Sequence, residues 1–155
     1  MRAGLLLTLV MAGCAAQASG SAEPAPGALG TTVADQTWTG LLNCDAMPPS
    51  TTKPLHQPIT LEVRNGTASF GRDVLKPDSR ITSGFQERTS GRVSADGAVS
   101  LTGQGLSERS GYSAEYQGTL PPSGERAELT GRQHWLLPRS GPVDRNCTVT
   151  LRRAS

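Results

Sequence analysis

The side chains that most often carry catalysis are few in this chain, and they show no catalytic spacing. Among its 155 residues are two histidines, His56 in a Pro-rich segment and His134 near a predicted strand end, and neither has a second ligand at metal-binding spacing. The chain contains no G-x-S-x-G elbow, no phosphate-binding glycine loop and no H-E-x-x-H motif. Three carboxylates lie on polar strand faces, which favours a solvated or cross-strand-paired role: Glu62, Glu115 and Glu128. We therefore expect a protein that is not an enzyme and that needs no cofactor or metal.

Cys14 stands directly behind an apolar run near the N-terminus. Residues 1–13 have the layout of a secretory signal, with one positive side chain, Arg2, then an apolar segment and then small residues. The apolar segment would make a helix about 16 Å long, whereas a membrane span needs roughly 20 residues, so it is predicted to direct export. The residues M-A-G-C that end at Cys14 resemble the lipobox of bacterial lipoproteins. The resemblance implies cleavage before Cys14 and its lipidation, palmitate included; the alternative is an ordinary cleaved signal with an incidental cysteine.

The residues after Cys14 predict where the protein is held. Lipoproteins of bacteria with two membranes usually go to the outer membrane unless Asp follows the lipidated cysteine, and here Ala15 follows. The resemblance thus implies a lipid anchor at the periplasmic face of the outer membrane, to which each buried CH₂ contributes about 0.8 kcal/mol. Residues 14–35 are mostly Ala, Gly, Ser, Thr and Pro, which predicts a flexible tether behind the lipidated N-terminus. Residues 36–155 then form one small domain.

Cys44 and Cys147 are the cysteines that remain if Cys14 is lipidated. An even pair in an exported chain predicts a disulfide, with two reduced, buried cysteines as the alternative. The chain has two Phe, two Tyr and two Trp against 18 Gly and 11 Pro, so a domain built from it would gain from a covalent link. Closing a loop of about 100 residues removes on the order of 4.7 kcal/mol of unfolded-chain entropy. This is comparable to the whole net stability of a small domain.

From residue 36 onward, short runs alternate apolar and polar residues. Asn65-Gly66 and Asp96-Gly97 each stand between two such runs, which is the strongest short-range signal for a β-hairpin. No window after residue 14 shows helical periodicity. About eight strands are predicted from nine such segments, which lie at 38–44, 59–64, 67–70, 81–87, 91–95, 98–101, 112–117, 127–132 and 147–151.

Short consecutive strands joined by tight turns predict an all-β antiparallel meander that closes into a small barrel. In the first strand Cys44 shares a face with Trp38 and Leu42, and in the last strand Cys147 shares a face with Leu151. Both sulfurs would then point inward, and a bond between them would tie the first strand to the last and remove exposed edges. A β-sandwich with the same disulfide is the alternative.

Four aromatic residues are the candidates for binding: Trp38, Tyr112, Tyr116 and Trp135. If they point inward, they either fill the barrel or line a pocket for an apolar ligand. With so few aromatic residues in the chain, a filled core is favoured. The segment 46–58, which contains four prolines, is long for a loop in such a domain. A loop of this kind at a barrel mouth can carry binding, but a plain crossover is favoured.

Three short segments resemble, in their order, elements of the membrane-bound C-type lysozyme inhibitors, which are small periplasmic lipoproteins with a disulfide-linked β-barrel. They are N-C-D at 43–45, L-E-V-R-N-G-T-A-S-F at 61–70 and S-G-Y at 110–112. The resemblance implies that Ser110 and Tyr112 lie near an inhibitory loop, although the family's tryptophan-lysine-glycine element is missing. The W-x-G-x-x-x-C start and C-x-V-x-L-R end of the domain are also similar to small exported bacterial β-domains with no assigned activity.

The net charge and the predicted export limit the classes of partner that the protein could bind. The formal net charge of the chain is +2 with no basic cluster, which together with export argues against nucleic acid. The sequence therefore predicts a lipid-anchored binding or interaction protein of the cell envelope. It would be held at the membrane by Cys14 and present its loops to an envelope protein or to the cell wall. The alternatives are a lysozyme-inhibitor-like protein and a carrier of a small apolar ligand.

Overall fold

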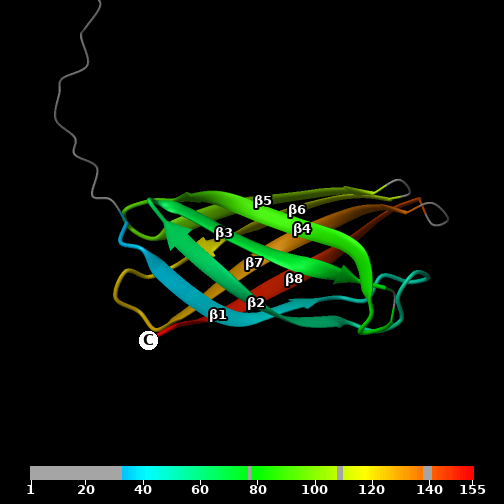
Figure 1. Ribbon diagram of the computed structural model, residues 1–155, viewed down its shortest axis with the longest axis horizontal. Helices are drawn as coiled ribbons and strands as arrows, with labels where there is room; N and C mark the ends of the chain where they lie inside the picture. Colours follow the sequence, from blue (N-terminus) through cyan, green and yellow to red (C-terminus); the bar gives the residue numbers. More distant parts are fainter. Residues whose placement is uncertain (1–32, 77, 108–109, 138–140) are drawn as a thin grey trace, which may run out of the picture.

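Eight antiparallel strands follow one another around a closed barrel, in which each strand pairs with the next and the last pairs with the first (Figure 1). The structure, a computed structural model, describes residues 33–76, 78–107, 110–137 and 141–155. The strands are β1 (Gln36–Cys44), β2 (Leu55–Arg64), β3 (Thr67–Leu75), β4 (Thr82–Val93), β5 (Ala98–Ser107), β6 (Ser110–Thr119), β7 (Arg126–Leu137) and β8 (Gly141–Arg153). The predicted all-β meander barrel is confirmed.

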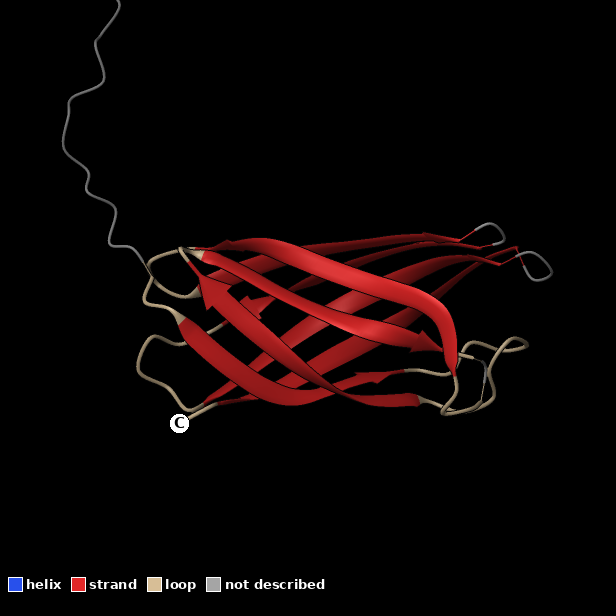
Figure 2. Cartoon of the chain, viewed as in Figure 1, coloured by secondary structure: helices blue, strands red, loops and turns tan. Residues whose placement is uncertain are grey.

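The described part of the chain consists of strands and the loops and turns between them (Figure 2). No helix in it has the length and apolar character needed to cross a membrane. Cys14, the signal segment 1–13 and the tether up to residue 32 lie outside the described residues.

The disulfide closes the barrel as the sequence predicts. Cys44 and Cys147 are Cα partners in the ladder between β1 and β8, and their sulfur atoms are bonded. Both cysteines are 4% exposed and share the inward face of their strands with Trp38, Leu42 and Leu151. Because β1 and β8 also pair along seven residues, the barrel is confirmed over the alternative sandwich.

The barrel has one end at which the β2–β3 and β4–β5 turns lie, and we call it the closed end. The half of the barrel next to this end is filled with apolar side chains. Its largest fully buried apolar side chains are Trp38, Leu42, Leu61, Leu101, Leu120 and Leu129. Arg153 covers this end, with its guanidinium 4.8 Å from the centre of the Trp38 ring and its Nη2 donating to the carbonyl of Pro121 at 2.6 Å. The alternation of apolar and polar residues thus produces an apolar core in this half.

Strand β4 joins two segments that the sequence predicts as separate, 81–87 and 91–95. Where they meet, the inward positions are occupied by Glu87, which ends the first segment, and by Thr89, which follows it. Both are buried, so the alternation continues there without apolar residues. Gly91 allows the strand to continue, because a Cβ there would lie 1.8 Å from the carbonyl oxygen of Ser100 on β5. The sequence predicts two strands here because the interior side chains are polar, and the strand itself is continuous.

The loop between β1 and β2 is shorter than the predicted segment 46–58. It ends at Pro54, and β2 begins at Leu55 despite the proline at position 58. Pro58 is the Cα partner of Leu41 in the ladder with β1. The recorded ladder with β3 involves only Glu62–Arg64, so on that side no backbone donor is required from Pro58.

Gly97 is held in a backbone conformation that few other residues adopt, and it is packed against the closed end. It has a φ of +87°, donates its N–H to the carbonyl of Ser94 and accepts from the N–H of Leu120, both at 2.8 Å. A Cβ at this position would lie 2.2 Å from the carbonyl oxygen of Leu120. Gly66, in the Asn-Gly turn, has a similar φ of +72°, but its nearest neighbour would be 3.9 Å away.

These two glycines make a matched test. We expect Gly97→Ala to lower the free energy of unfolding by about 2–3 kcal/mol, since it adds a backbone clash to the conformational strain. Gly66→Ala should cost about 1 kcal/mol, since only the positive φ opposes it. Urea unfolding of both variants measures the difference, and equal losses would contradict the role assigned to Leu120.

Candidate ligand cavity at the open end

The end of the barrel opposite the closed end contains a cavity of about 680 Å³. The β1–β2 and β3–β4 loops lie at this open end, on the right in Figure 1. Its apolar lining comes from five strands or loops, through Met47, Leu55, Val74, Phe85, Trp135 and Leu137. Cavities of this size with apolar walls and a few convergent polar groups are the usual form of small-molecule sites.

The strands β2 and β3 separate toward the open end. Their ladder covers three residue pairs, Glu62–Arg64 with Thr67–Ser69, next to the turn. Beyond it the Gln57 side chain bridges the two strands. Its Nε2 donates to the carbonyl of Asp73 at 2.9 Å, and its Oε1 accepts from Nη1 of Arg72 at 3.0 Å. This separation leaves room for the cavity while the bridging amide keeps β3 in place.

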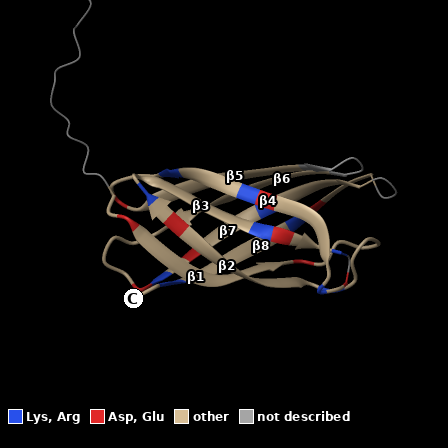
Figure 3. Cartoon of the chain, viewed as in Figure 1, with Lys and Arg blue, Asp and Glu red and all other residues tan. Residues whose placement is uncertain are grey.

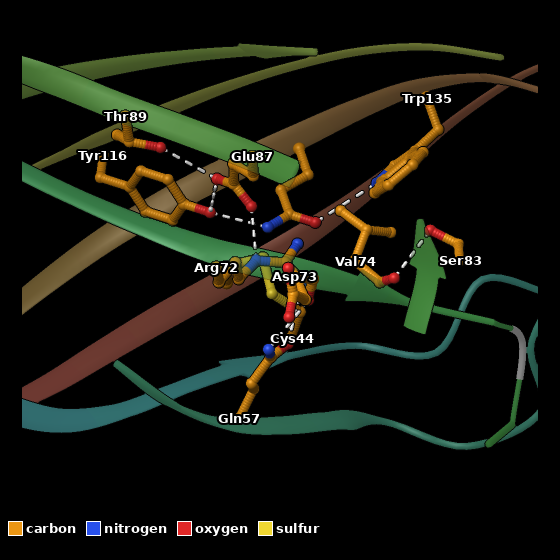
Figure 4. Close-up of polar contacts among 12 residues, drawn as sticks. Cys44, Gln57, Arg72, Asp73, Val74, Ser83, Glu87, Thr89, Tyr116 and Trp135 are labelled. Atoms are coloured by element: carbon orange, nitrogen blue, oxygen red, sulfur yellow. Dashed lines mark hydrogen bonds and ion pairs between the residues drawn. A yellow bond between two sulfur atoms is a disulfide. The ribbon is translucent and has the colours of Figure 1, made fainter. Parts of the chain in front are cut away.

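Four buried polar side chains form a layer between the cavity and the apolar core, and we call this layer the polar floor: Arg72, Glu87, Gln133 and Arg145. Figure 4 shows Arg72 and Glu87 of this layer. Arg72 and Glu87 are Cα partners in the β3–β4 ladder, and Gln133 and Arg145 are Cα partners in the β7–β8 ladder. All four side chains point into the barrel and are at most 7% exposed. The two arginines line the cavity directly.

The carboxylate of Glu87 is the acceptor for three donors. The Nε of Arg72 donates to its Oε2 at 2.5 Å, and the hydroxyl of Thr89 donates to its Oε1 at 3.0 Å. The hydroxyl of Tyr116 lies 3.4 Å from the same Oε1. Such charge-assisted bonds compensate the cost of burying a carboxylate.

Hydrogen bonds continue from Tyr116 across the barrel to Arg145. The Nε2 of Gln133 donates to the Tyr116 hydroxyl at 2.7 Å, and the Oε1 of Gln133 accepts from Nε of Arg145 at 2.8 Å. The guanidinium of Arg145 lies 5.7 Å from the centre of the Trp135 ring. Burial and the charge of Arg72 lower the pKa of Arg145 to about 10. Within the described residues, no acidic side chain is close enough to Arg145 to form an ion pair.

Two polar atoms of this region are buried and lack a hydrogen-bond partner among the described residues: Nη2 of Arg72 and the hydroxyl of Tyr112. The ring of Tyr112 packs 4.5 Å from that of Trp135 and edge-on to Phe85. Phe85 in turn lies over Gly105, where a Cβ would come within 1.9 Å of its ring. The small residue on β5 therefore sets the position of an aromatic side chain of the cavity wall.

Tyr112 and Tyr116 are the only tyrosines of the chain, and both are buried beside Glu87. Burial, followed by the charge of Glu87, raises the pKa of Tyr116 to about 12 and that of Tyr112 well above its usual value. Both phenols therefore stay neutral in the folded protein at pH values at which a free tyrosine ionises.

We expect the folded protein to show no tyrosinate absorbance as the pH passes about 10, whereas the denatured chain ionises both phenols there. Above that pH the unfolded chain releases protons that the folded protein retains. Stability should therefore fall by about 1.4 kcal/mol per pH unit for each tyrosine until the folded pKa is reached. A spectrophotometric titration with and without urea tests this, and Tyr116→Phe should halve the signal of the denatured chain. Ionisation of the folded protein near pH 10 would contradict the burial of these hydroxyls.

The four aromatic residues that the sequence indicates as candidates for binding lie in two different places, two at the cavity and two in the core. Trp135 lines the cavity, and Tyr112 packs directly behind it. Tyr116 and Trp38 are fully buried in the core, at 1% and 0% exposure. Tyr112, which the lysozyme-inhibitor resemblance places near an inhibitory loop, is 5% exposed inside the barrel, and the side chain of Ser110 is not among those described.

Both histidines are exposed, and His56 is among the residues at the cavity. Nδ1 of His56 is 2.8 Å from Oδ1 of Asn43, and Nδ1 of His134 is 2.5 Å from Oδ1 of Asp144. The bond from His134 is the main cause of a lowered pKa for Asp144. The three carboxylates on polar strand faces are exposed. In the described ranges, no group of three or more His, Cys, Asp or Glu side chains is placed to hold a metal ion.

The polar floor is the part of the site that sequence reasoning missed. Its signal is a charged residue at an inward position: Arg72 has the same parity as Phe70 and Val74, which flank it on the buried face of β3. Two guanidinium groups beside a cavity, of which only Arg72 is paired with a carboxylate, can hold an anionic group by hydrogen bonds and by charge. No protein family, characterised protein or solved structure matches this chain.

Proposed function

We propose that the chain is a non-catalytic, lipid-anchored binding protein of the cell envelope, whose barrel takes a small ligand with an apolar body. Cys14 would carry the lipid and hold the barrel at the periplasmic face of the outer membrane. The cavity of about 680 Å³ at the open end is the observation that carries the proposal, because the other half of the same barrel is filled by its own side chains.

The distribution of apolar side chains favours a ligand inside the barrel over a protein partner on its surface. The large apolar side chains exposed among the described residues are Leu41, Ile81 and Leu136, which come from three different parts of the chain. The apolar residues of the open end instead converge on one cavity. A carrier therefore ranks above a protein that presents only its loops.

Native mass spectrometry tests this proposal. Residues 15–155 contain both hydrogen-bonded neighbours of every strand, so this fragment retains the whole barrel. Secreted into an oxidising periplasm behind an exchangeable signal and purified without detergent, it should carry a reproducible extra mass that leaves on denaturation. Cys14→Ser in the full chain should abolish palmitate labelling and leave an uncut precursor, and labelling that persists would contradict the anchor.

The two tryptophans provide an internal reporter and its control, because Trp135 lines the cavity and Trp38 lies in the filled core. In Trp38→Phe the remaining emission comes from Trp135, and it should change when a ligand enters. In Trp135→Phe the emission comes from Trp38, and it should not. A bare protein mass together with unchanged Trp135 emission in the presence of apolar probes would overturn the proposed function.

A further inference from the structure

The permanent charges buried inside the barrel do not balance. Three such side chains are at most 7% exposed among the described residues, Arg72, Glu87 and Arg145, and one of them is acidic. Glu87 is paired with Arg72, so the charge of Arg145 is left without an acidic partner in the described part of the chain. A buried charge without a partner is costly in a protein interior. An anion from outside the chain would remove this cost.

Hydrogen-bond donors of both arginines are left over at the cavity. Nε of Arg145 donates to Gln133, which is the hydrogen bond that this side chain makes within the described residues, and the side chain lines the cavity. Arg72 uses Nε for Glu87 and Nη1 for Gln57, and its Nη2 is buried without a partner. Guanidinium groups of this kind bind carboxylate or phosphate oxygens through paired N–H···O bonds.

The mouth of the cavity has the same sign of charge as its floor. Lys53, Lys76 and Arg80 line it, and the acidic residue of the lining, Asp78, accepts hydrogen bonds from the backbone of Thr52 and Lys53. With Arg72 and Arg145, five basic residues and one acidic residue line the cavity. On the strands, basic and acidic residues are interspersed (Figure 3). The basic excess in the cavity lining attracts anions.

Apolar side chains occupy the wall between the charged floor and the mouth. Val74 lies two residues beyond Arg72 on β3, its Cα partner Phe85 faces it from β4, and Trp135 lies opposite on β7. We infer that the ligand is an amphiphile with one negative charge, which it places against Arg145 and Arg72 while its apolar body extends along this wall toward the mouth. The inference rests on the proposed function and specifies the chemistry of its ligand.

The net charge of the polar floor sets the charge of the ligand. Two guanidinium groups and one carboxylate leave a single positive charge in the barrel, which one negative charge neutralises. A carboxylate has this charge, and its two oxygens match the fork of donors that a guanidinium offers. A neutral headgroup would leave Arg145 unpaired, and a cationic one would add to the imbalance.

Probes that share a decyl chain and differ in headgroup test the inference on residues 15–155. Decanoate and decyltrimethylammonium are titrated below their micelle concentrations and 1-decanol below its solubility limit, all at neutral pH, with Trp135 emission in Trp38→Phe as the readout. We expect decanoate to bind about 10–100-fold more tightly than 1-decanol. Decyltrimethylammonium should bind more weakly than either. Acetate at the same concentrations should not compete with decanoate, because the apolar body is also required.

The variant Arg145→Gln tests whether Arg145 is the residue that recognises the negative charge of the ligand. It should weaken decanoate binding by about tenfold or more while leaving 1-decanol binding unchanged, and Arg145→Lys should restore part of the difference. Arg88→Gln is the matched control, since Arg88 is the exposed neighbour of Glu87 on β4 and should not alter either affinity. Urea unfolding of each variant verifies that it is folded, and the headgroup comparison on unaltered Arg145 decides the matter if the variants are not.

The outcomes separate the inference from the proposal beneath it. Equal affinity for 1-decanol and decanoate would overturn the inference and leave the proposed function standing. Competition by acetate as strong as by decanoate would overturn it in favour of a small anion. An equal loss of both affinities in Arg145→Gln would reduce Arg145 to a structural role. If no decyl probe changes the emission of Trp135 and the purified protein carries no extra mass, the proposed function itself fails.

Discussion

Replacing Cys44 and Cys147 together by alanine is expected to lower the free energy of unfolding by about 4 kcal/mol. The disulfide closes a loop with a sequence separation of 103 residues, so its loss greatly enlarges the conformational freedom of the unfolded chain. It also links the first strand to the last, the most distant pairing in the sequence. For a small domain this loss approaches the whole net stability.

Urea unfolding of the oxidised protein, the reduced protein and the double variant measures the effect. Reduction should cost about as much as the double substitution, because both remove the same constraint from the unfolded state. Hydrogen exchange should show the largest loss of protection in β1 and β8, where the seam is no longer tied. A loss below about 1 kcal/mol would mean that ladder hydrogen bonds and core packing close the barrel without the disulfide.

Replacing Glu87 by leucine is expected to cost about 3–5 kcal/mol, because it leaves Arg72 buried without a counter-ion. The effect is aggravated by Arg145, whose charge Arg72 already opposes. Combining Arg72→Met with Glu87→Leu should restore most of this stability, because an apolar pair of similar volume needs neither desolvation nor a partner. The order of stability should therefore be wild type, then the double variant, then Glu87→Leu.

A double-mutant cycle over Arg72 and Glu87 measures their coupling directly, and it should be of the order of 3 kcal/mol for a buried pair. Glu115→Leu, at an exposed position of β6, is the matched control and should change stability by no more than about 0.5 kcal/mol. If the two single substitutions simply add in the double variant, the ion pair is not what holds this part of the floor together.

Much of the fold could be predicted from local features of the sequence. The Asn65-Gly66 turn and the alternating runs on either side of it give the β2–β3 hairpin, because adjacent strands pair across a tight turn. The alternation within β1 and β8 places Cys44 and Cys147 on inward faces, and an even pair of cysteines in a chain that is predicted to be exported indicates the bond between them. These features depend on residues that are close together in the chain, or on the number of cysteines.

The same alternation fails where the interior is polar. Polar residues at inward positions interrupt the apolar–polar alternation in three strands, so these parts of the strands were not predicted. They are Glu87 and Thr89 in the middle of β4, Gln133 in the open-end half of β7 and Arg145 in the first half of β8. Each of these residues occupies an inward position, but the cost of burying its polar side chain is offset only by a partner on another strand. That partner is set by register: Glu87 meets Arg72 because β3 and β4 align them, and Arg145 meets Gln133 because β7 and β8 do.

By itself, the sequence determined the class of fold, the order of the strands and the disulfide, since turn chemistry and the inward face of a strand are local properties. Only the tertiary structure decided that one half of the barrel is filled and the other holds a cavity above a charged floor. Alternation shows which side chains point inward, but not whether they fill the space at their level. That depends on the summed volumes and charges of side chains from all eight strands, which only the closed barrel brings together.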